Sequence, residues 1–151
     1  MEKFVIQSDN KGLAAVEKYV SVFCDEKHIH NYFATISTSV LQAVENAIVH
    51  GNNSDVTKQV TVECGDYCGG IYFTIEDQGN GFDVSQYGDL PKEDTKGEGI
   101  FLMKTLADNL EFSNGGRCVR LEFAIQGIET DDTVKRIKTL DHFYSLKQVN
   151  A

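Results

Sequence analysis

Apolar residues recur at two different spacings along the chain, and the changes of spacing predict the order of the elements. Residues 4–8 alternate between apolar and polar positions, which predicts a strand. Residues 10–26 then carry apolar side chains at intervals of three and four, which is typical of a helix. A second helix with one apolar face is expected from about Tyr32 to Val49.

Two further stretches have the pattern of a hairpin. Residues 59–64 and 70–77 alternate on either side of a glycine-containing turn, which the residues 65–67 between two cysteines would form. Residues 111–125 contain another pair of alternating runs, separated by the Asn-Gly-Gly sequence at 114–116. Each stretch therefore predicts two antiparallel strands.

The order of these elements indicates the fold class. Two helices precede most of the strands, so the chain is not a doubly wound array of strand–helix–strand units. It favours an α/β two-layer sandwich, in which helices pack on one face of a mixed, mostly antiparallel sheet. A third helix is expected at about 98–109. We expect one domain at 1–127 and a helical extension at 128–151, N-capped by Thr130 or Asp131 and part of the same compact unit.

Composition narrows the classes of function. A chain of 151 residues with 41% hydrophobic residues can build one domain with its own core. It has no apolar run long enough to span a membrane and no secretory signal pattern, so we expect a cytoplasmic protein. The net charge of −9 argues against nucleic-acid and membrane binding, and an anionic ligand would need a cation beside it.

The cysteines have two interpretations. They are Cys24, Cys64, Cys68 and Cys118. A zinc site at Cys64 and Cys68 would need two more ligands, such as His28 and His30. Reduced thiols of a cytosolic protein that serve as packing residues are the favoured interpretation.

The second helix carries an unusual polar stripe. Because successive helical residues rotate by about 100°, Ser39, Gln42, Asn46 and His50 fall on one narrow line beside the apolar face. Asn is a poor helix former, so a function should compensate for Asn46. The alternative is a solvated helix edge.

Two glycine motifs follow. Asp77 ends a predicted strand, and Gly79 and Gly81 come after it at Asp-x-Gly-x-Gly spacing, which suits either a flat ligand or a tight turn. Gly97 and Gly99 are expected to precede a helix whose first-turn N–H groups attract phosphate, although caps and turns use glycine as freely. The second motif has the context of neither a Rossmann nor a Walker loop.

The polar stripe, the two glycine motifs and the strand that begins after Gly115-Gly116 follow one another along the chain. In this order they resemble the ATPase superfamily of gyrase, heat-shock chaperones, histidine kinases and MutL. They resemble in particular the stand-alone bacterial anti-sigma factor serine kinases. The pattern Glu-x-x-x-Asn-Ala-x-x-His-Gly of those kinases is matched by "QAVENAIVHG" at Asn46, Ala47, His50 and Gly51. The resemblance covers about residues 4–125.

The resemblance implies ATP and Mg²⁺ as cofactors and assigns roles to the motifs. Asn46 would bind Mg²⁺ through its carboxamide oxygen. Asp77 would hold the adenine amino group, and Gly79 and Gly81 would shape the base pocket. Residues 83–96 would form a mobile lid.

The phosphate end and the partners follow from the same resemblance. Gly97 and Gly99 would present backbone N–H groups to phosphate, and Lys96 would add charge. His50 is interpreted as a packing residue at the helix end rather than as a ligand. The implied partners are a sigma factor, an anti-sigma factor antagonist protein or both, and homodimerisation stays open.

The sequence departs from the family at two places. Gln42 stands where the family has its general-base glutamate, and Glu45, the other candidate for a catalytic role, lies about 100° away from Asn46 around the helix. Arg117 and Cys118 stand where the family usually has threonines, one of which helps to hold the adenine end.

Two functions therefore remain open. The first is a protein kinase that transfers the ATP γ-phosphoryl group to a serine or threonine of an antagonist protein. The second is a nucleotide-dependent binding module with little turnover. An ATP-binding domain that serves a separate histidine-bearing protein is less favoured, because no helical dimerisation segment precedes residue 4.

Overall fold

One open sheet of five strands forms the base of the computed structural model, which describes residues 1–87, 95–125 and 138–146. The strands are β1 (Glu2–Gln7), β2 (Gln59–Tyr67), β3 (Gly70–Glu76), β4 (Asn109–Ser113) and β5 (Cys118–Ala124). Their order across the sheet is β1-β2-β3-β5-β4, and all four pairings are antiparallel. The mostly antiparallel sheet of the sequence analysis is thus confirmed, and no parallel pair occurs among the described strands.

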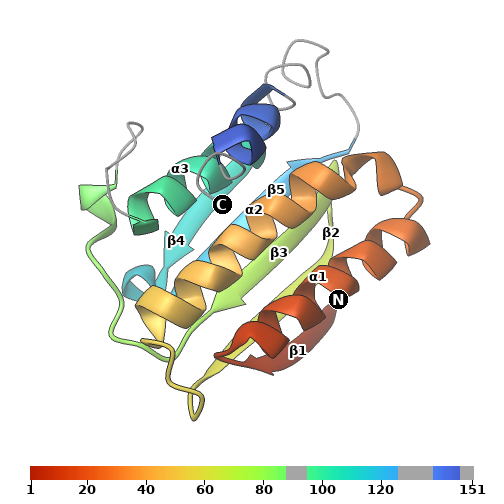
Figure 1. Ribbon diagram of the computed structural model, residues 1–151. Helices are drawn as coiled ribbons and strands as arrows, with labels where there is room; N and C mark the ends of the chain where they lie inside the picture. The colour runs from red at the N-terminus through yellow and green to blue at the C-terminus, as the bar shows by residue number, and fades with distance from the viewer. Residues whose placement is uncertain (88–94, 126–137, 147–151) are drawn as a thin grey trace.

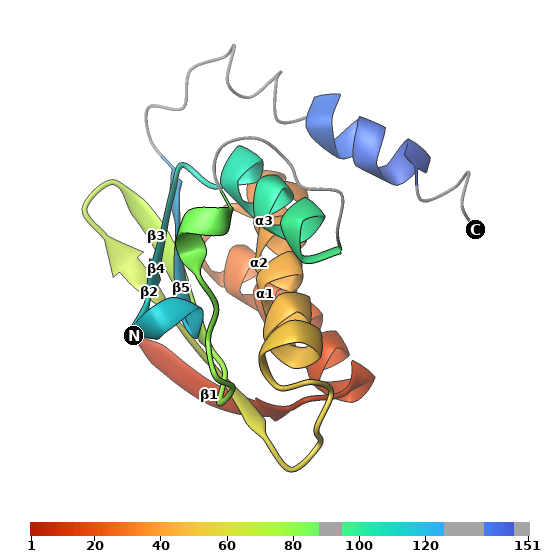
Figure 2. The ribbon, with the colours of Figure 1, turned by 90° about the vertical axis from the view of Figure 1, so that its left-hand side faces the viewer.

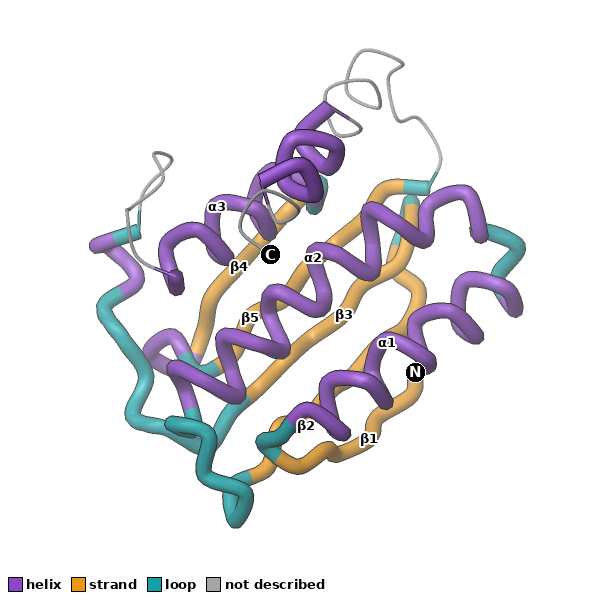
Figure 3. The backbone as a smooth tube through the Cα atoms, in the orientation of Figure 1, coloured by secondary structure: helices purple, strands orange, loops and turns teal. Residues whose placement is uncertain are grey.

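Three helices cover one face of this sheet (Figures 1 and 2). They are α1 (Asn10–Glu26), α2 (Phe33–Asn46) and α3 (Thr95–Leu106). Figure 3 shows α2 running across the middle of the sheet between the other two helices. The predicted two-layer α/β architecture is therefore confirmed.

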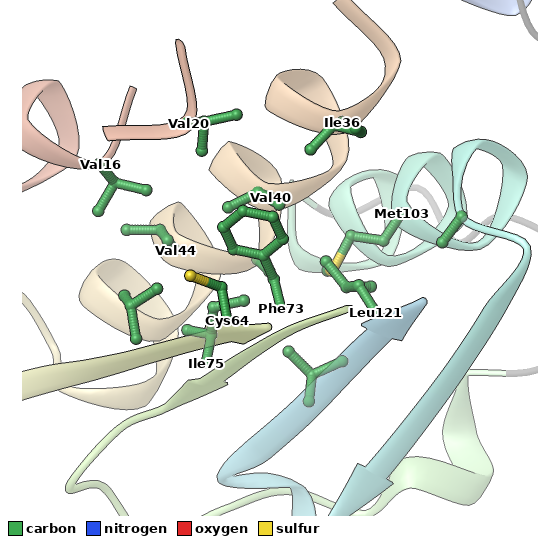
Figure 4. Close-up of a cluster of buried hydrophobic side chains, with 14 of the residues drawn as sticks. Val16, Val20, Ile36, Val40, Val44, Cys64, Phe73, Ile75, Met103 and Leu121 are labelled. Carbon is green, nitrogen blue, oxygen red and sulfur yellow. The ribbon is translucent and has the colours of Figure 1, made fainter. Parts of the chain in front are cut away.

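The core lies between the two layers and is nearly closed to solvent. Phe73 of β3 projects towards α2 at its centre, among Val16, Val20, Ile36, Val40, Val44 and Leu121 (Figure 4). Its ring meets that of Phe23 of α1 edge-on, with 5.4 Å between the ring centroids. This packing fixes α2 and β3, which both carry site residues.

The second helix does not stop at Asn46. The chain continues as one wide π-helical turn, Ala47–Gly51. Such turns insert an extra residue into the helix and are frequent at functional sites. The predicted end at Val49 falls inside this turn.

The turn between β2 and β3 differs from the prediction. Residues 65–67 belong to β2, and Tyr67 pairs with Gly70, so Cys68 and Gly69 form a two-residue connection. Gly69 adopts a φ of +104°, which favours glycine. The packing role proposed for all four cysteines is wrong for the exposed Cys68.

The other cysteines are consistent with packing. Cys24 and Cys64 are buried and Cys118 is half-buried, and all four thiols are free. Within the described ranges, no three His, Cys, Asp or Glu side chains are grouped in a way that could hold a metal ion. The zinc alternative is not supported there.

The third helix begins earlier than predicted. It starts at Thr95 and ends at Leu106, so Gly97 and Gly99 lie in its first and second turns rather than before it. The prediction placed both glycines before the helix. The glycines instead belong to the helix, and the reason for Gly99 is its close packing against α2, described below.

A further helical segment covers residues 138–146. Leu140 of this segment is buried against Leu102 and Leu106 of α3, and the hydroxyls of Tyr144 and Thr38 lie 3.2 Å apart. The expected N-cap, Thr130 or Asp131, and the main part of the expected lid, 88–94, lie outside the described residues. None of the helices that the structure describes is both long enough and apolar enough to cross a membrane.

Candidate functional site

A hollow opens where α2, α3 and the ends of β3 and β5 converge. Apolar side chains such as Ile75, Ile100 and Val119 line part of its wall. The polar residues on the wall are Asn46, His50, Asp77, Lys96 and Arg117. The structure therefore brings Asn46, Asp77 and Lys96, which are distant in sequence, into one cavity.

Asn46, in the wall of this hollow, has an amide nitrogen without a hydrogen-bond partner in the part of the chain that the structure describes. Its Nδ2 atom is buried and has no hydrogen-bond partner among the described residues. A buried polar group without a partner costs about 1–3 kcal/mol. Such a donor beside a cavity is typical of a side chain that completes its hydrogen bonds with a ligand.

The polar stripe of α2 faces α3 rather than solvent. Ser39 is completely buried, and its hydroxyl donates to the Met103 carbonyl oxygen at 3.4 Å. A Cβ atom on Gly99 would lie 3.1 Å from the side-chain oxygens of both Gln42 and Asn46. The stripe is therefore part of a helix–helix interface, and Gly99 makes room for two of its side chains.

Asp77 lies directly after β3, at the other side of the hollow. Its Oδ1 atom accepts a hydrogen bond of 2.8 Å from the Gly79 N–H, and its backbone N–H donates to the Arg117 carbonyl oxygen at 3.0 Å. Desolvation raises the pKa of the carboxyl group, while the Gly79 hydrogen bond and the positive charges of Lys96 and Arg117 oppose the shift. The carboxylate is thus held by the backbone and remains available as an acceptor.

The glycines around Asp77 allow the backbone to pass close to it. A side chain on Gly51 would collide with the Asp77 carboxylate, and one on Gly79 would collide with the Gly51 carbonyl. Gly81 has a φ of +78° and lies against the Gly115 carbonyl. These contacts explain why the Asp-x-Gly-x-Gly spacing and the Gly51 position occur together.

Phe82 and Lys96 form a contact that the sequence did not reveal. The Lys96 Nζ lies 3.5 Å from the centre of the Phe82 ring, which also meets the rings of Tyr87 and Phe112 edge-on. Cation–π contacts of this kind stabilise by about 0.5–2 kcal/mol. The aromatic ring and the lysine border the hollow together. A phenylalanine directly after the Asp-x-Gly-x-Gly motif was the available signal.

Comparison with known proteins agrees with this geometry. Residues 6–123 match the histidine kinase-like ATPase domain. The chain belongs to this family. It is also similar to proteins named anti-sigma F factor from several Clostridium perfringens strains, including SM101 and 13. The identity is 31% over 115 residues, which cover 72% of this chain and 81% of each relative. The resemblance inferred from the motifs is confirmed.

The ATPase domain has no glutamate at the position of the family's general base. Gln42 is half-buried against Gly99 and is not part of the wall of the hollow, and Glu45 is exposed. Among the described residues that line the hollow, Asp77 is the sole carboxylate. A catalytic role for Gln42 or Glu45 stays a prediction.

Of the two positions usually held by threonine, only one lines the hollow. Arg117 lines the hollow, as Val119 does two residues later, whereas Cys118 pairs with Glu76 and Ser113 and does not line it. Burial raises the pKa of the Cys118 thiol. Of the two departures from the family pattern, only Arg117 can meet a ligand in the hollow.

A hydrogen-bond network of a buried amide, which the sequence analysis did not predict, lies next to the site. Asn52 follows the π-helical turn and is fully buried. It donates to the Ser8 hydroxyl at 2.9 Å and to the Gln59 carbonyl at 3.0 Å. The available signal was the run Gly-Asn-Asn at the end of the helix. One Asn is enough to end a helix, so the second indicates another role.

Proposed function

We propose that this protein binds ATP together with Mg²⁺ in the hollow and regulates transcription as an anti-sigma factor. In this proposal it acts in the cytoplasm and controls a sigma factor through an antagonist protein. The observation that carries the proposal is the convergence of Asn46, Asp77 and Lys96 on one cavity. Family membership and the similarity to anti-sigma F factors support it.

The base of the nucleotide is assigned to Asp77. A carboxylate accepts hydrogen bonds only, so it suits the exocyclic amino group of adenine. Gly79 and Gly81 keep side chains away from the plane of the base. The apolar wall residues Ile75, Ile100 and Val119 supply surface for the faces of the ring.

Mg²⁺ is assigned to Asn46. Mg²⁺ prefers oxygen ligands and usually takes only one or two from the protein, the others coming from phosphate and water. The carboxamide oxygen of Asn46, a residue in the wall of the hollow, is a ligand of this kind. When bound, Mg²⁺ would neutralise phosphate charge and polarise the terminal phosphate.

Lys96 and the beginning of α3 are assigned to the phosphates. The N-terminal end of a helix favours anions, and α3 begins at Thr95, beside the hollow. Gly97 and Gly99 keep their proposed place near the phosphates. Phosphates would compete with the Phe82 ring for the Lys96 ammonium group.

The local charge of the site supports an anionic ligand despite the acidic chain. The total charge is −9, yet the part of the wall that the structure describes carries Lys96 and Arg117 against one carboxylate, Asp77. Fields of nearby charges decide which ligand a cleft attracts. A polyphosphate with bound Mg²⁺ is compatible with this balance.

The two candidate activities, a kinase and a binding module, differ in how fast they transfer the γ-phosphoryl group of ATP. A serine/threonine kinase would need a group that accepts the proton of the attacking hydroxyl. The described wall has no second carboxylate, and the side chain of Gln42 lies against Gly99. Both observations favour a nucleotide-dependent binding module with slow phosphotransfer. The kinase remains the alternative.

Calorimetry with ATP and ADP, with and without Mg²⁺, tests the proposal. We expect binding that depends on Mg²⁺ and that weakens on replacement of Asn46 by alanine. Transfer of γ-phosphate to a candidate antagonist protein then separates the kinase from the binding module. A lack of heat at millimolar nucleotide would remove the ATP-binding proposal.

A further inference from the structure

Arg117 occupies the base side of the hollow, where the family pattern has threonine. It directly precedes β5, and its side chain lines the hollow, as that of Val119 does two residues later. Its stem passes over Gly81: a Cβ atom on that glycine would lie 3.6 Å from the Arg117 Cγ. The Nε atom donates to the Asn114 carbonyl oxygen at 3.0 Å, which anchors one edge of the guanidinium group.

Arg117 is also coupled to the proposed base-binding carboxylate. The Arg117 carbonyl oxygen accepts a hydrogen bond of 3.0 Å from the Asp77 N–H. The two residues therefore enter the hollow from hydrogen-bonded positions on neighbouring segments. The wall of the hollow thus carries an acceptor-only side chain, that of Asp77, and a donor-only side chain, that of Arg117.

This pair of groups matches the edge of guanine. Guanine has a carbonyl oxygen, O6, next to two donors, the ring N1–H and the exocyclic amino group. A carboxylate can accept from both donors, and arginine donates readily to guanine O6. Adenine offers an amino donor and a ring-nitrogen acceptor, so it can make fewer charge-assisted hydrogen bonds to the same pair.

We propose that Arg117 reads the base and that the hollow accepts guanine nucleotides as well as adenine nucleotides. The guanidinium group donates to the base acceptor adjacent to the atoms that Asp77 holds. This inference rests on the proposed nucleotide site and specifies its selectivity. Threonine at this position would remove the donor fork and return the preference to adenine.

Lys96 and Arg117 have different roles in this arrangement. Lys96 comes from the first turn of α3, whereas Arg117 lies beside Gly81 and Asp77. If Arg117 met the phosphates instead, its loss would weaken all triphosphates alike. The selectivity between bases, rather than the affinity itself, therefore identifies a base-reading residue.

The test is calorimetry of the full chain with Mg-GTP and Mg-ATP, for the unaltered protein and for Arg117→Thr. We expect both nucleotides to bind the unaltered protein, with dissociation constants within about tenfold of each other, because hydrogen bonds to charged groups set the difference. Arg117→Thr should raise the dissociation constant for GTP about tenfold or more relative to that for ATP, since one charge-assisted contact is lost.

Arg120→Thr is the matched control. Arg120 lies three residues further along on the outer face, where its guanidinium group stacks 4.0 Å from the centre of the Tyr72 ring and its Nε lies 3.5 Å from Glu122. This variant should leave the GTP-to-ATP ratio unchanged. Arg117→Lys keeps the charge but not the planar set of N–H donors, so it should give an intermediate GTP-to-ATP ratio. If the threonine variant does not fold, the lysine variant serves as the test.

Three results would overturn the inference. The first is ATP binding without measurable GTP binding in the unaltered protein. The second is an equal loss of affinity for both nucleotides in Arg117→Thr. The third is a ratio of the GTP and ATP dissociation constants that Arg117→Lys and Arg117→Thr leave unchanged. Binding of neither nucleotide would remove the proposed function as well. ATP binding alone would leave that function standing and remove only the inference about Arg117.

Discussion

The Asn52 side-chain oxygen accepts a hydrogen bond of 2.8 Å from the backbone N–H of Gln78. Gln78 follows Asp77 directly, so this contact ties the proposed base-binding carboxylate to the end of the α2 helical path. The Asn52 amide nitrogen donates in addition to Ser8 and Gln59. One buried amide thus joins the segments after β1 and β3 and the start of β2.

Replacing Asn52 with alanine is expected to destabilise the protein and weaken nucleotide binding together. The substitution leaves the Gln78 N–H without its acceptor and removes two more hydrogen bonds of the buried Asn52 amide, which should lower the free energy of unfolding by about 2–4 kcal/mol. Urea denaturation measures the loss. The control is Asn53→Gly, at an exposed neighbour with a φ of 52°, where the change should stay within about 0.5 kcal/mol. Equal effects at both positions would contradict the proposed role of Asn52.

Asp77→Asn should stabilise the protein without nucleotide at neutral pH and weaken nucleotide binding. Desolvation raises the pKa of Asp77 above 3.8, so the folded state holds its proton to higher pH than the unfolded state does. This favours folding at low pH, and the benefit is lost as pH rises through the folded-state pKa. Asparagine has no charge to desolvate and can still accept from Gly79. Its advantage in melting temperature should be present at pH 7 and shrink as the pH approaches 4.

Asp55→Asn provides a control of opposite sign. Asp55 is exposed, and hydrogen bonds from the Thr57 side chain and backbone lower the pKa of its carboxyl group. Its charged form is therefore favoured in the folded state, and the amide should bring no gain in melting temperature at pH 7. A rise in both variants would mean that the reduction of net negative charge, rather than desolvation of Asp77, stabilises the protein.

Leu140→Ala is expected to release the helix at 138–146 from α3. Leu140 is 6% exposed against Leu102 and Leu106, and truncation of a buried leucine costs about 2–5 kcal/mol. Hydrogen exchange should become faster in this helix and in α3 while α1 keeps its protection. Leu146→Ala, at a residue that is 50% exposed on the same helix, should change neither. Unchanged exchange in Leu140→Ala would show that the helix is held elsewhere.

Local periodicity was sufficient to predict the elements but not all of their boundaries. The bounds of α1 were predicted correctly because its apolar spacing is regular. The β2–β3 turn was misplaced because Gly65 looked like a turn residue. In the structure Gly65 lies within β2, and a Cβ atom there would lie 3.0 Å from the Tyr72 ring, so the glycine serves cross-strand packing.

The site could be predicted only where a motif is local in sequence. The placement of Asn46 and Asp77 in one cavity follows from motifs at fixed positions along a helix and a strand end. The Phe82–Lys96 contact and the Asn52 network depend on how distant segments meet, which a single sequence does not encode as spacing. Gly99 was misjudged for the same reason, because the carboxamides that it accommodates belong to another helix.

Gln42 occupies the position at which the family has its general base. Its side-chain oxygen lies near Gly99, on the same helix face as the Asn46 carboxamide. Gln42→Glu preserves length and helix propensity while supplying a proton acceptor. It should raise γ-phosphate turnover by about 10²-fold or more, since general-base catalysis contributes 10²–10⁴-fold, and leave ATP affinity nearly unchanged. Turnover is measured with a candidate antagonist present. Glu45→Gln, at an exposed position, is the control and should have no effect. If the unaltered protein already turns over rapidly and Glu45→Gln abolishes this activity, Glu45 is the base, and Gln42 serves only the packing of α2 against α3.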